Sequence, residues 1–228
     1  MLYTEEAVKA NIRNREGKRV FYLGQADTLT PGARDWLNRE RIAILPATLA
    51  KPDRYRLLSG GYTEEKPEHM THLNAEYLVP KNHPRILFRG CMDTLEAELI
   101  LAQLAVPENI GTQLGEILAL ARTLIRCDVL NEAVPQKPLC GLTEDAQRSR
   151  SHRPQDFYGQ PHFMPEAADG IAIARINRAR CAAREAELKA VDAFRDADGI
   201  PTRPDILQAL NRMSSMLYIL MIQLKADK

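Results

Sequence analysis

The sequence predicts a mainly α-helical protein in which an antiparallel helix bundle follows a small N-terminal α/β unit. Two observations carry this fold class. From residue 71 onward, long stretches repeat apolar residues every three or four positions, the period of a helix with one buried face. Residues 1 to about 48 instead alternate short helical and short strand patterns. With 228 residues, the chain is long enough for one substantial core plus such a small unit.

The N-terminal unit is expected to contain a short helix, a strand in "RVFYL", a helix in "TPGARDWLNRE" and a strand in "IAIL". Thr30 is a good N-cap for the second helix, and Pro31 fits its first turn. Residues 49–70 hold prolines and a Gly-Gly pair among charges, which is typical of a linker or mobile loop. We therefore divide the chain into residues 1–70 and 71–228.

The bundle is expected to use four long helical patterns, in residues 85–106, 108–130, 171–194 and 203–220. The second has a single apolar stripe: Ile110, Leu114, Ile117, Ala121 and Leu124. Between the second and third patterns, residues 134–170 form a long irregular stretch rich in Pro, Gly, His and aromatic residues. Loops of this length inside a compact domain are usually functional or disordered, and the aromatic content argues against disorder.

The last helical pattern, "RPDILQALNRMSSMLYIL", carries polar residues in its middle. Pro204 fits the first helical position, and Asp205 complements the positive end of the helix dipole. The expected buried stripe consists of Ile206, Leu210, Met213, Leu217 and Leu220. Beside it lies a flank made of Leu207, Asn211, Ser214, Ser215 and Tyr218. This flank is either ordinary surface or the wall of a site.

Charge and cysteine usage exclude several classes of protein. Thirty-one Lys and Arg residues balance thirty Asp and Glu residues, so no overall field draws the chain to nucleic acid or a membrane. The four cysteines (Cys91, Cys127, Cys140 and Cys181) form no CxxC pair, which indicates a reducing compartment. The N-terminus lacks a signal-peptide pattern, and the apolar run at residues 216–222 is too short to span a bilayer. We expect a soluble, cytoplasmic protein.

Arg180, Arg184 and Glu187 in "RARCAAREAE" are spaced to share one helix face. Two guanidinium groups one turn apart suit a polyphosphate, because each planar fork donates two charge-assisted hydrogen bonds. The alternative is a solvated face on which Glu187 bridges back to an arginine. On spacing alone the solvated face is the simpler explanation.

Asp93 lies in an apolar helical pattern, where an unpaired buried carboxylate would be costly. Either an arginine of the 180–184 pair neutralises it, or Asp93 lies on the exposed face. Lys81 and Arg85, around Pro84 at a helix start, are candidate anion contacts, although basic residues are also commonplace before helices. His69 and His72 lack a third metal ligand nearby. The chain also has no P-loop, no dinucleotide-binding fingerprint and no GxSxG motif.

Three segments resemble the ATP:corrinoid adenosyltransferases, most closely their ethanolamine-utilisation type. "RPDILQALNRMSSMLY" resembles the C-terminal helix of that type, and its "LNRMSS" core is similar to "NRLSD" of the PduO type. "KNHPRILFRGCMDTLEAEL" resembles the PduO-type pattern "KDDPRVEAYGTVDELNA", and "RARCAAREAE" resembles "RxxCRRAE". The segments occur in the same order across residues 71–224. "TEEAVKANIRN" and "LTPGARDWL" near the N-terminus also look like the ethanolamine-utilisation type.

The resemblance implies a five-helix bundle that binds ATP and cobalamin at a subunit interface of a homo-oligomer, either a trimer or a dimer. It implies that Lys81 and Arg184 contact the triphosphate and that Asp93 orients Arg180. Glu187 and Asn211 would hold the nucleotide and its Mg2+, with Arg212 near them. Thr71 and His72 would replace the N-terminal ATP loop of the PduO type, which is missing here.

The resemblance also implies an apolar side chain that displaces the lower ligand of cobalamin and so makes Co(II) easier to reduce. In "HFMPEA" this residue is expected to be Phe163, with Met164 and Tyr158 as nearby alternatives. Some enzymes of the ethanolamine-utilisation type carry a cysteine cluster for a divalent metal before the "THL" segment. The segment "SGGYTEEKPEHMTHL" has no cysteine, so we expect no zinc or iron site.

The activity implied is transfer of the 5'-deoxyadenosyl group of ATP to Co(I) of cobalamin, for use by an ethanolamine ammonia-lyase. The expected partners are that lyase, a cobalamin reductase and the shell of a bacterial microcompartment, with no nucleic acid and no membrane. The alternative is a non-catalytic carrier that binds corrinoid or ATP without turnover.

Overall fold

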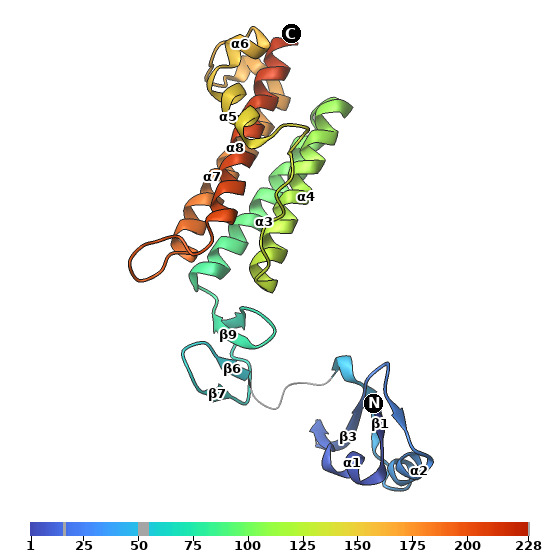
Figure 1. Ribbon diagram of the computed structural model, residues 1–228. Coiled ribbons are helices and arrows are strands. Elements are labelled where there is room, and N and C mark those ends of the chain that lie inside the picture. The colour runs from blue at the N-terminus through green and yellow to red at the C-terminus, as the bar shows by residue number, and fades with distance from the viewer. Residues whose placement is uncertain (16, 50–54, 228) are drawn as a thin grey trace. The chain divides into compact units, whose positions relative to one another are not determined.

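The computed structural model describes residues 1–15, 17–49 and 55–227 and confirms a mainly helical chain with a small strand-containing N-terminal unit (Figure 1). Its contacts divide the chain into two compact units, Met1–Tyr55 and Arg56–Lys228. No helix in the described ranges is both long and apolar enough to cross a bilayer.

The N-terminal unit contains the four expected elements in the expected order, together with three short strands that the sequence did not predict. Its helices are α1 (Glu5–Ala10) and α2 (Pro31–Arg39), and its strands are β1 (Leu2–Tyr3), β2 (Arg13–Arg15), β3 (Lys18–Leu23), β4 (Thr28–Leu29) and β5 (Ala43–Pro46). β3 is central in the order β2-β3-β5 and runs parallel to β5, while β1 pairs with β4. The Thr30 hydroxyl accepts the Ala33 N–H, which confirms the predicted N-cap. The unit has its own core: Val8, Phe21, Ala33, Leu37 and Ile42.

A second small sheet lies where the sequence predicts a linker. It contains β6 (Tyr55–Leu57), β7 (Tyr62–Thr63), β8 (Met70–His72) and β9 (Tyr77–Pro80), in the order β7-β6-β9-β8. Short strands therefore lie within the stretch predicted as a linker or mobile loop, while residues 50–54 lie outside the described residues. Strands of two to four residues are too short to show a period of two in the sequence. The predicted boundary at residue 70 falls within β8 and stays a prediction.

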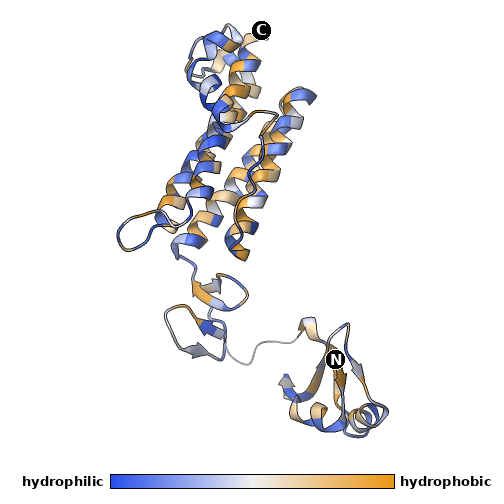
Figure 2. Cartoon of the chain, viewed as in Figure 1, coloured by the Kyte–Doolittle hydropathy of each residue, from blue (hydrophilic) through white to orange (hydrophobic). Residues whose placement is uncertain are grey.

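Four long helices form the bundle: α3 (Pro84–Gln103), α4 (Glu108–Leu130), α7 (Gly170–Ala193) and α8 (Pro204–Ala226). α7 packs most extensively against α3 and α8, and α3 also packs against α4. The apolar residues of these helices gather on the faces that meet (Figure 2). Every residue of the two predicted stripes on α4 and α8 is buried, which confirms both helices and their faces.

Residues 134–170 contain more structure than the sequence predicts. The stretch includes α5 (Glu144–His152), α6 (Pro154–Tyr158) and the 3-10 turn η2 (Ala167–Asp169). Thr143 caps α5 by accepting the Ala146 N–H, and α5 packs against α8 as a short fifth helix. Sequence periodicity missed α5 because it is strongly polar and nine residues long, so it shows almost no apolar stripe.

The start of α8 is tied to the end of α4. Arg203 donates to both carboxylate oxygens of Asp205 at 2.9 Å and to the carbonyl oxygens of Cys127 and Glu132. Asp205 also accepts the Val134 N–H at 3.0 Å. The hydrogen bond from Arg203 lowers the pKa of Asp205 to about 2, so this carboxylate stays charged at neutral pH. These bonds fix where α8 begins relative to α4.

A buried ion cluster joins α3 to α4. Asp128 is fully buried and accepts the Arg85 Nε–H at 2.7 Å and the Arg89 Nε–H at 2.6 Å. Arg85 also donates to the Asp128 carbonyl oxygen at 2.7 Å. Two cations and several hydrogen bonds around one carboxylate compensate for its loss of water. Arg85 therefore has a structural role, as part of this ion cluster.

Replacing Asp128 with alanine should destabilise the bundle by about 3 to 5 kcal/mol, because it leaves two partly buried guanidinium groups without their counter-charge. Urea denaturation measures this change in the free energy of unfolding. Glu96→Ala is the matched control, since it breaks the Glu96–Arg122 pair, whose arginine is 60% exposed, and should cost less than about 1 kcal/mol. Equal effects of the two variants would contradict a special role for the buried cluster.

Candidate functional site

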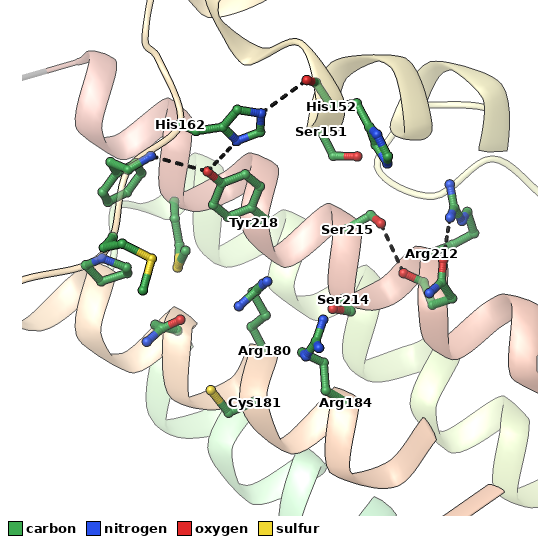
Figure 3. A pocket seen from close by; sticks show the side chains of 16 residues that line it. Ser151, His152, His162, Arg180, Cys181, Arg184, Arg212, Ser214, Ser215 and Tyr218 are labelled. Atoms are coloured by element: carbon green, nitrogen blue, oxygen red, sulfur yellow. Dashed lines mark hydrogen bonds between the residues drawn. The ribbon is translucent and has the colours of Figure 1, made fainter. Parts of the chain in front are cut away.

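A cavity of about 810 Å3 lies among α7, α8 and the segment that includes the end of α5 and residues 162–165 (Figure 3). α7 contributes Asn177, Arg180, Cys181 and Arg184. α8 contributes Asn211, Arg212, Ser214, Ser215, Tyr218 and Met221. The remaining wall consists of Ser151, His152, His162, Phe163, Met164 and Pro165. The polar flank of α8 is therefore the wall of a cavity and not ordinary surface.

The local sequence of α7 explains why its long side chains point to this cavity. Its buried face is mostly small, with five fully or almost fully buried alanines: Ala179, Ala182, Ala183, Ala186 and Ala190. Small side chains let helix backbones approach closely, and they leave no room for a guanidinium group in the packed interface. Arg180 and Arg184 consequently lie on the remaining face, one turn apart, as the spacing predicts.

One end of the cavity is cationic. Figure 3 shows Arg180 and Arg184 projecting from α7 beside Ser214 and Tyr218. The Arg180 guanidinium carbon lies 5.4 Å from the centre of the Tyr218 ring, and its Nε is buried without a hydrogen-bond acceptor. No aspartate or glutamate of the described chain lines this cavity. An unsatisfied buried donor on a cation favours an anionic ligand there, because such a group is costly to leave unpaired.

A series of hydrogen-bonded polar residues lies beside the cationic end of the cavity. Asn211 donates from Nδ2 to Glu187 Oε1 at 3.1 Å, and Arg212 donates to Asn211 Oδ1. Ser215 donates its hydroxyl hydrogen to the Asn211 carbonyl oxygen at 3.1 Å. Glu187 does not line the cavity itself and reaches it through Asn211. These hydrogen bonds fix the orientation of the Asn211 amide. The residues that the sequence predicts as one site do come together in space: Arg180, Arg184, Glu187, Asn211 and Arg212.

The other end is largely apolar and is formed by Phe163, Met164, Pro165 and Met221. Phe163 is half-buried and packs against the bundle core, with Lys225 Nζ 5.3 Å from its ring centre. Met164 is 84% exposed at the rim. Tyr158 lies outside the cavity lining, in α6, where its hydroxyl accepts a hydrogen bond from Arg150 at 3.5 Å. Among the three aromatic or apolar candidates, Phe163 is the one that is both partly buried and in the cavity wall.

Several sequence-predicted residues do not reach this cavity within one chain. Asp93 is exposed on α3 and makes no ion pair with Arg180 in the described chain, so the exposed-face alternative holds for it. Lys81 pairs with Glu68 at 3.3 Å, before the start of α3. Thr71 and His72 lie in β8, paired with β9. The site roles of these four residues stay predictions.

Sequence reasoning did not assign a site role to Tyr218, His162, Ser151 or Asn177. Tyr218 shared the polar flank of α8 with Asn211, which was the signal that could have identified it. Asn177 is one turn before Arg180, at the spacing that the Arg180–Arg184 pair continues. His162 and Ser151 come from the irregular stretch, where no period relates them to α7 or α8.

The donor set of the cavity favours an anion over a metal ion. Its charged lining residues are arginines, and the described residues contain no group of three or more His, Cys, Asp or Glu side chains that could hold a metal. Glu187, adjacent to the arginines through Asn211, offers a carboxylate oxygen to a cation that arrives with an anionic ligand.

Comparison with known proteins places the chain among proteins of one family and fold. The family model described as "Cobalamin adenosyltransferase" matches residues 61–224. The chain is 31% identical to the corrinoid adenosyltransferase EutT of Salmonella typhimurium and 30% identical to EutT of Escherichia coli, in each case over 96% of this chain and 90% of the relative. A variant PduO-type ATP:corrinoid adenosyltransferase from Lactobacillus reuteri, solved in complex with cobalamin and ATP, has a similar fold: the TM-score is 0.50 at 14% identity, over 76% of this chain and 88% of that one.

Proposed function

The chain belongs to the cobalamin adenosyltransferase family, and on this premise we propose that the cavity between α7 and α8 is where its transferase reaction takes place. In that reaction the 5'-deoxyadenosyl group of ATP moves to Co(I) of cobalamin. The observation that carries the proposal is the meeting, in one cavity of about 810 Å3, of two arginines one turn apart with an apolar end that includes Phe163. A triphosphate matches the first feature, and the apolar part of a corrinoid matches the second.

The arginines would act on the leaving group. Co(I) supplies the electron pair for the new Co–C bond, the C5'–O bond breaks, and the triphosphate leaves with the electrons of that bond. No proton is transferred in this step, so the protein needs no general base and works by positioning and by stabilising the developing charge. Arg180 and Arg184 would stabilise that charge; Arg180 is half-buried, so its electrostatic contact would be stronger than in water, whereas Arg184 lies at the exposed edge of the cavity.

The hydrogen-bonded polar residues beside the arginines would hold the nucleotide. Asn211, fixed between Glu187 and Arg212, presents an oriented amide to the cavity. Glu187 would contact the Mg2+ of MgATP, because Mg2+ prefers oxygen ligands and is usually held by one or two carboxylates plus phosphates. In this arrangement Mg2+ enters the site already bound to ATP.

At the apolar end, Phe163 would occupy the lower face of the corrinoid, with Met164 beside it at the rim. An apolar side chain in place of the lower ligand leaves Co(II) with four ligands, which makes its reduction to Co(I) easier. Tyr158 is the less suitable candidate, because its ring lies outside the cavity wall.

A second copy of the chain would complete the site, with the active site at a subunit interface of a dimer or trimer. The outer face of α3 exposes Leu87, Ile100, Leu101 and Leu104 around Asp93. Exposed apolar residues gathered on one helix face indicate an interaction surface. Such an interface would bring Asp93 of one subunit to the unsatisfied Arg180 of another, and Lys81, Thr71 and His72 toward ATP.

The chemistry of the reaction also indicates which enzymes act before and after it. A Co(II)-to-Co(I) reduction has to precede the transfer, so a cobalamin reductase is a partner by reaction class. We propose that the product supplies an ethanolamine ammonia-lyase, in the cytoplasm or inside a bacterial microcompartment, on the ground that the curated relatives are of the EutT type.

Purified protein with ATP, Mg2+ and chemically reduced cobalamin should form adenosylcobalamin, followed as loss of the Co(I) absorbance. Turnover should survive a chelator of transition metals once Mg2+ is restored, because the described residues offer no cluster for such a metal. Tight binding of both substrates without turnover would support the carrier instead. Loss of turnover that only zinc or iron restores would contradict the metal-free site.

Replacing Arg184 with alanine should lower kcat/KM by about 100-fold or more, as loss of other pre-organised charge donors does. Steady-state kinetics at saturating cobalamin measure this. Arg178→Ala is the matched control on the same helix, because Arg178 lies outside the cavity and pairs with Glu98 and Glu185. Near wild-type kinetics of the Arg184 variant would remove Arg184 from the site.

Replacing Phe163 with alanine should slow the reaction that starts from Co(II) cobalamin more than the reaction that starts from preformed Co(I), because the side chain acts before the alkyl transfer. Parallel assays from the two oxidation states measure the difference. Phe157→Ala, on α6 outside the cavity lining, controls for loss of an aromatic ring nearby. Equal slowing of both reactions would refute the assigned role of Phe163.

A further inference from the structure

We propose that Tyr218 is a positioning residue whose hydroxyl group holds the backbone of residues 162–163 in place, so that Phe163 stays in the cavity wall. This inference rests on the proposed function, since it assigns Phe163 the corrinoid side of the site. The Tyr218 oxygen lies 2.9 Å from His162 Nδ1 and 3.4 Å from the Phe163 backbone nitrogen (Figure 3). One hydroxyl group of α8 therefore contacts two successive residues of the segment that carries Phe163.

The partners fix the direction of each hydrogen bond. His162 Nε2 lies 3.1 Å from the carbonyl oxygen of His152, which can only accept, so Nε2 carries the hydrogen. In a neutral ring Nδ1 then accepts, and the Tyr218 hydroxyl donates to it. The Tyr218 oxygen in turn accepts the Phe163 N–H. In this hydrogen-bond network every donor has an acceptor, and a fully satisfied network holds its groups in one arrangement.

The ring of Tyr218 makes a separate set of contacts. It stacks on His162 with a centre-to-centre distance of 5.8 Å and on Phe163 at 6.4 Å, and the Arg180 guanidinium lies 5.4 Å from its centre. The ring thus touches the cationic end of the cavity as well as the apolar end, whereas the hydrogen bonds of the hydroxyl within the described residues go to residues 162 and 163. Two substitutions can separate these roles, because phenylalanine keeps the ring and leucine removes it.

The segment has a different anchor on the other side of Phe163. Glu166 donates its backbone N–H to Asp169 at 2.9 Å, and Asp169, which is 4% exposed, pairs with Lys225. Lys225 also lies over the Phe163 ring. Both anchors reach back to α8, a rigid helix, and rigid supports hold a functional side chain more precisely than loops do. Loss of the Tyr218 hydroxyl would free residues 162–163 while the Asp169 anchor remains.

Tyr218→Phe should lower kcat/KM for cobalamin by about 5-fold when the assay starts from Co(II), as expected for losing one or two neutral hydrogen bonds, with little change in KM for ATP. The four-coordinate Co(II) signal in the electron paramagnetic resonance spectrum should fall in parallel. Tyr218→Leu should also raise KM for ATP, because Arg180 loses the ring it rests on. Tyr62→Phe, an exposed tyrosine in β7, is the matched control.

Hydrogen exchange provides a readout that does not need activity. The peptide covering residues 159–166 should exchange faster in Tyr218→Phe, and peptides of α3 and α4 should not change, since the hydrogen bonds of this hydroxyl in the described chain go to residues 162 and 163. His162→Asn should resemble wild type more than His162→Ala does, because the asparagine oxygen can replace Nδ1 as the acceptor.

The outcomes separate this inference from the proposed function. Wild-type kinetics, spectrum and exchange in Tyr218→Phe would overturn the positioning role while leaving the transferase intact. An equal rise of KM for ATP and for cobalamin in Tyr218→Phe would also overturn it, since a general disturbance of the cavity produces that result. A wild-type protein without turnover would refute the proposed function, and an unchanged exchange rate at residues 159–166 would then independently refute the hydroxyl anchor.

Discussion

Close packing of α7 on its alanine face is the constraint on which the site depends. From Ala179 to Ala190 the buried residues of α7 are all alanines, which give this part of the helix a narrow side toward α3 and α8. Arg180 and Arg184 lie outside this packed face and line the cavity, whereas Arg178 lies elsewhere on α7 and pairs with Glu98 of α3. The same packing that stabilises the bundle thus aligns Arg180 and Arg184 along one wall of the cavity.

The bundle uses its arginines in two opposite ways. Arg85 and Arg89 surround the fully buried Asp128, so their charge is neutralised and serves to join α3 to α4. Arg180 has a buried Nε without an acceptor and lies against an aromatic ring. Since Arg89 Nη2 also lacks an acceptor, the two kinds of arginine differ in counter-charge: a cation paired with a buried carboxylate stabilises the fold, whereas Arg180, which pairs with no carboxylate of the described residues, retains binding energy for an anionic ligand. This difference in partners, and not the number of arginines, locates the anion site.

Tyr218 links the two ends of the cavity. Its ring rests against the cationic wall, and its hydroxyl contacts the segment that carries Phe163. Since α8 also supplies Asn211 and Ser215, one helix supports the proposed nucleotide side and the proposed corrinoid side. A displacement of α8 would change both sides together, and the bonds of Arg203 and Asp205 at its start oppose such a displacement.

The sequence by itself determined the helices with long apolar stripes, the N-cap at Thr30, the helix start at Pro204, and the shared helix face of Arg180 and Arg184. Those features follow from a period of 3.6 residues and from capping chemistry, which are local. Only the tertiary structure decided that Asp93 is exposed, that β6 and β7 form where a linker was expected, and that His162 and Tyr218 share a hydrogen bond 56 residues apart. Short strands and the polar α5 bury too little apolar surface to leave a pattern, and contacts between distant segments depend on how the helices pack.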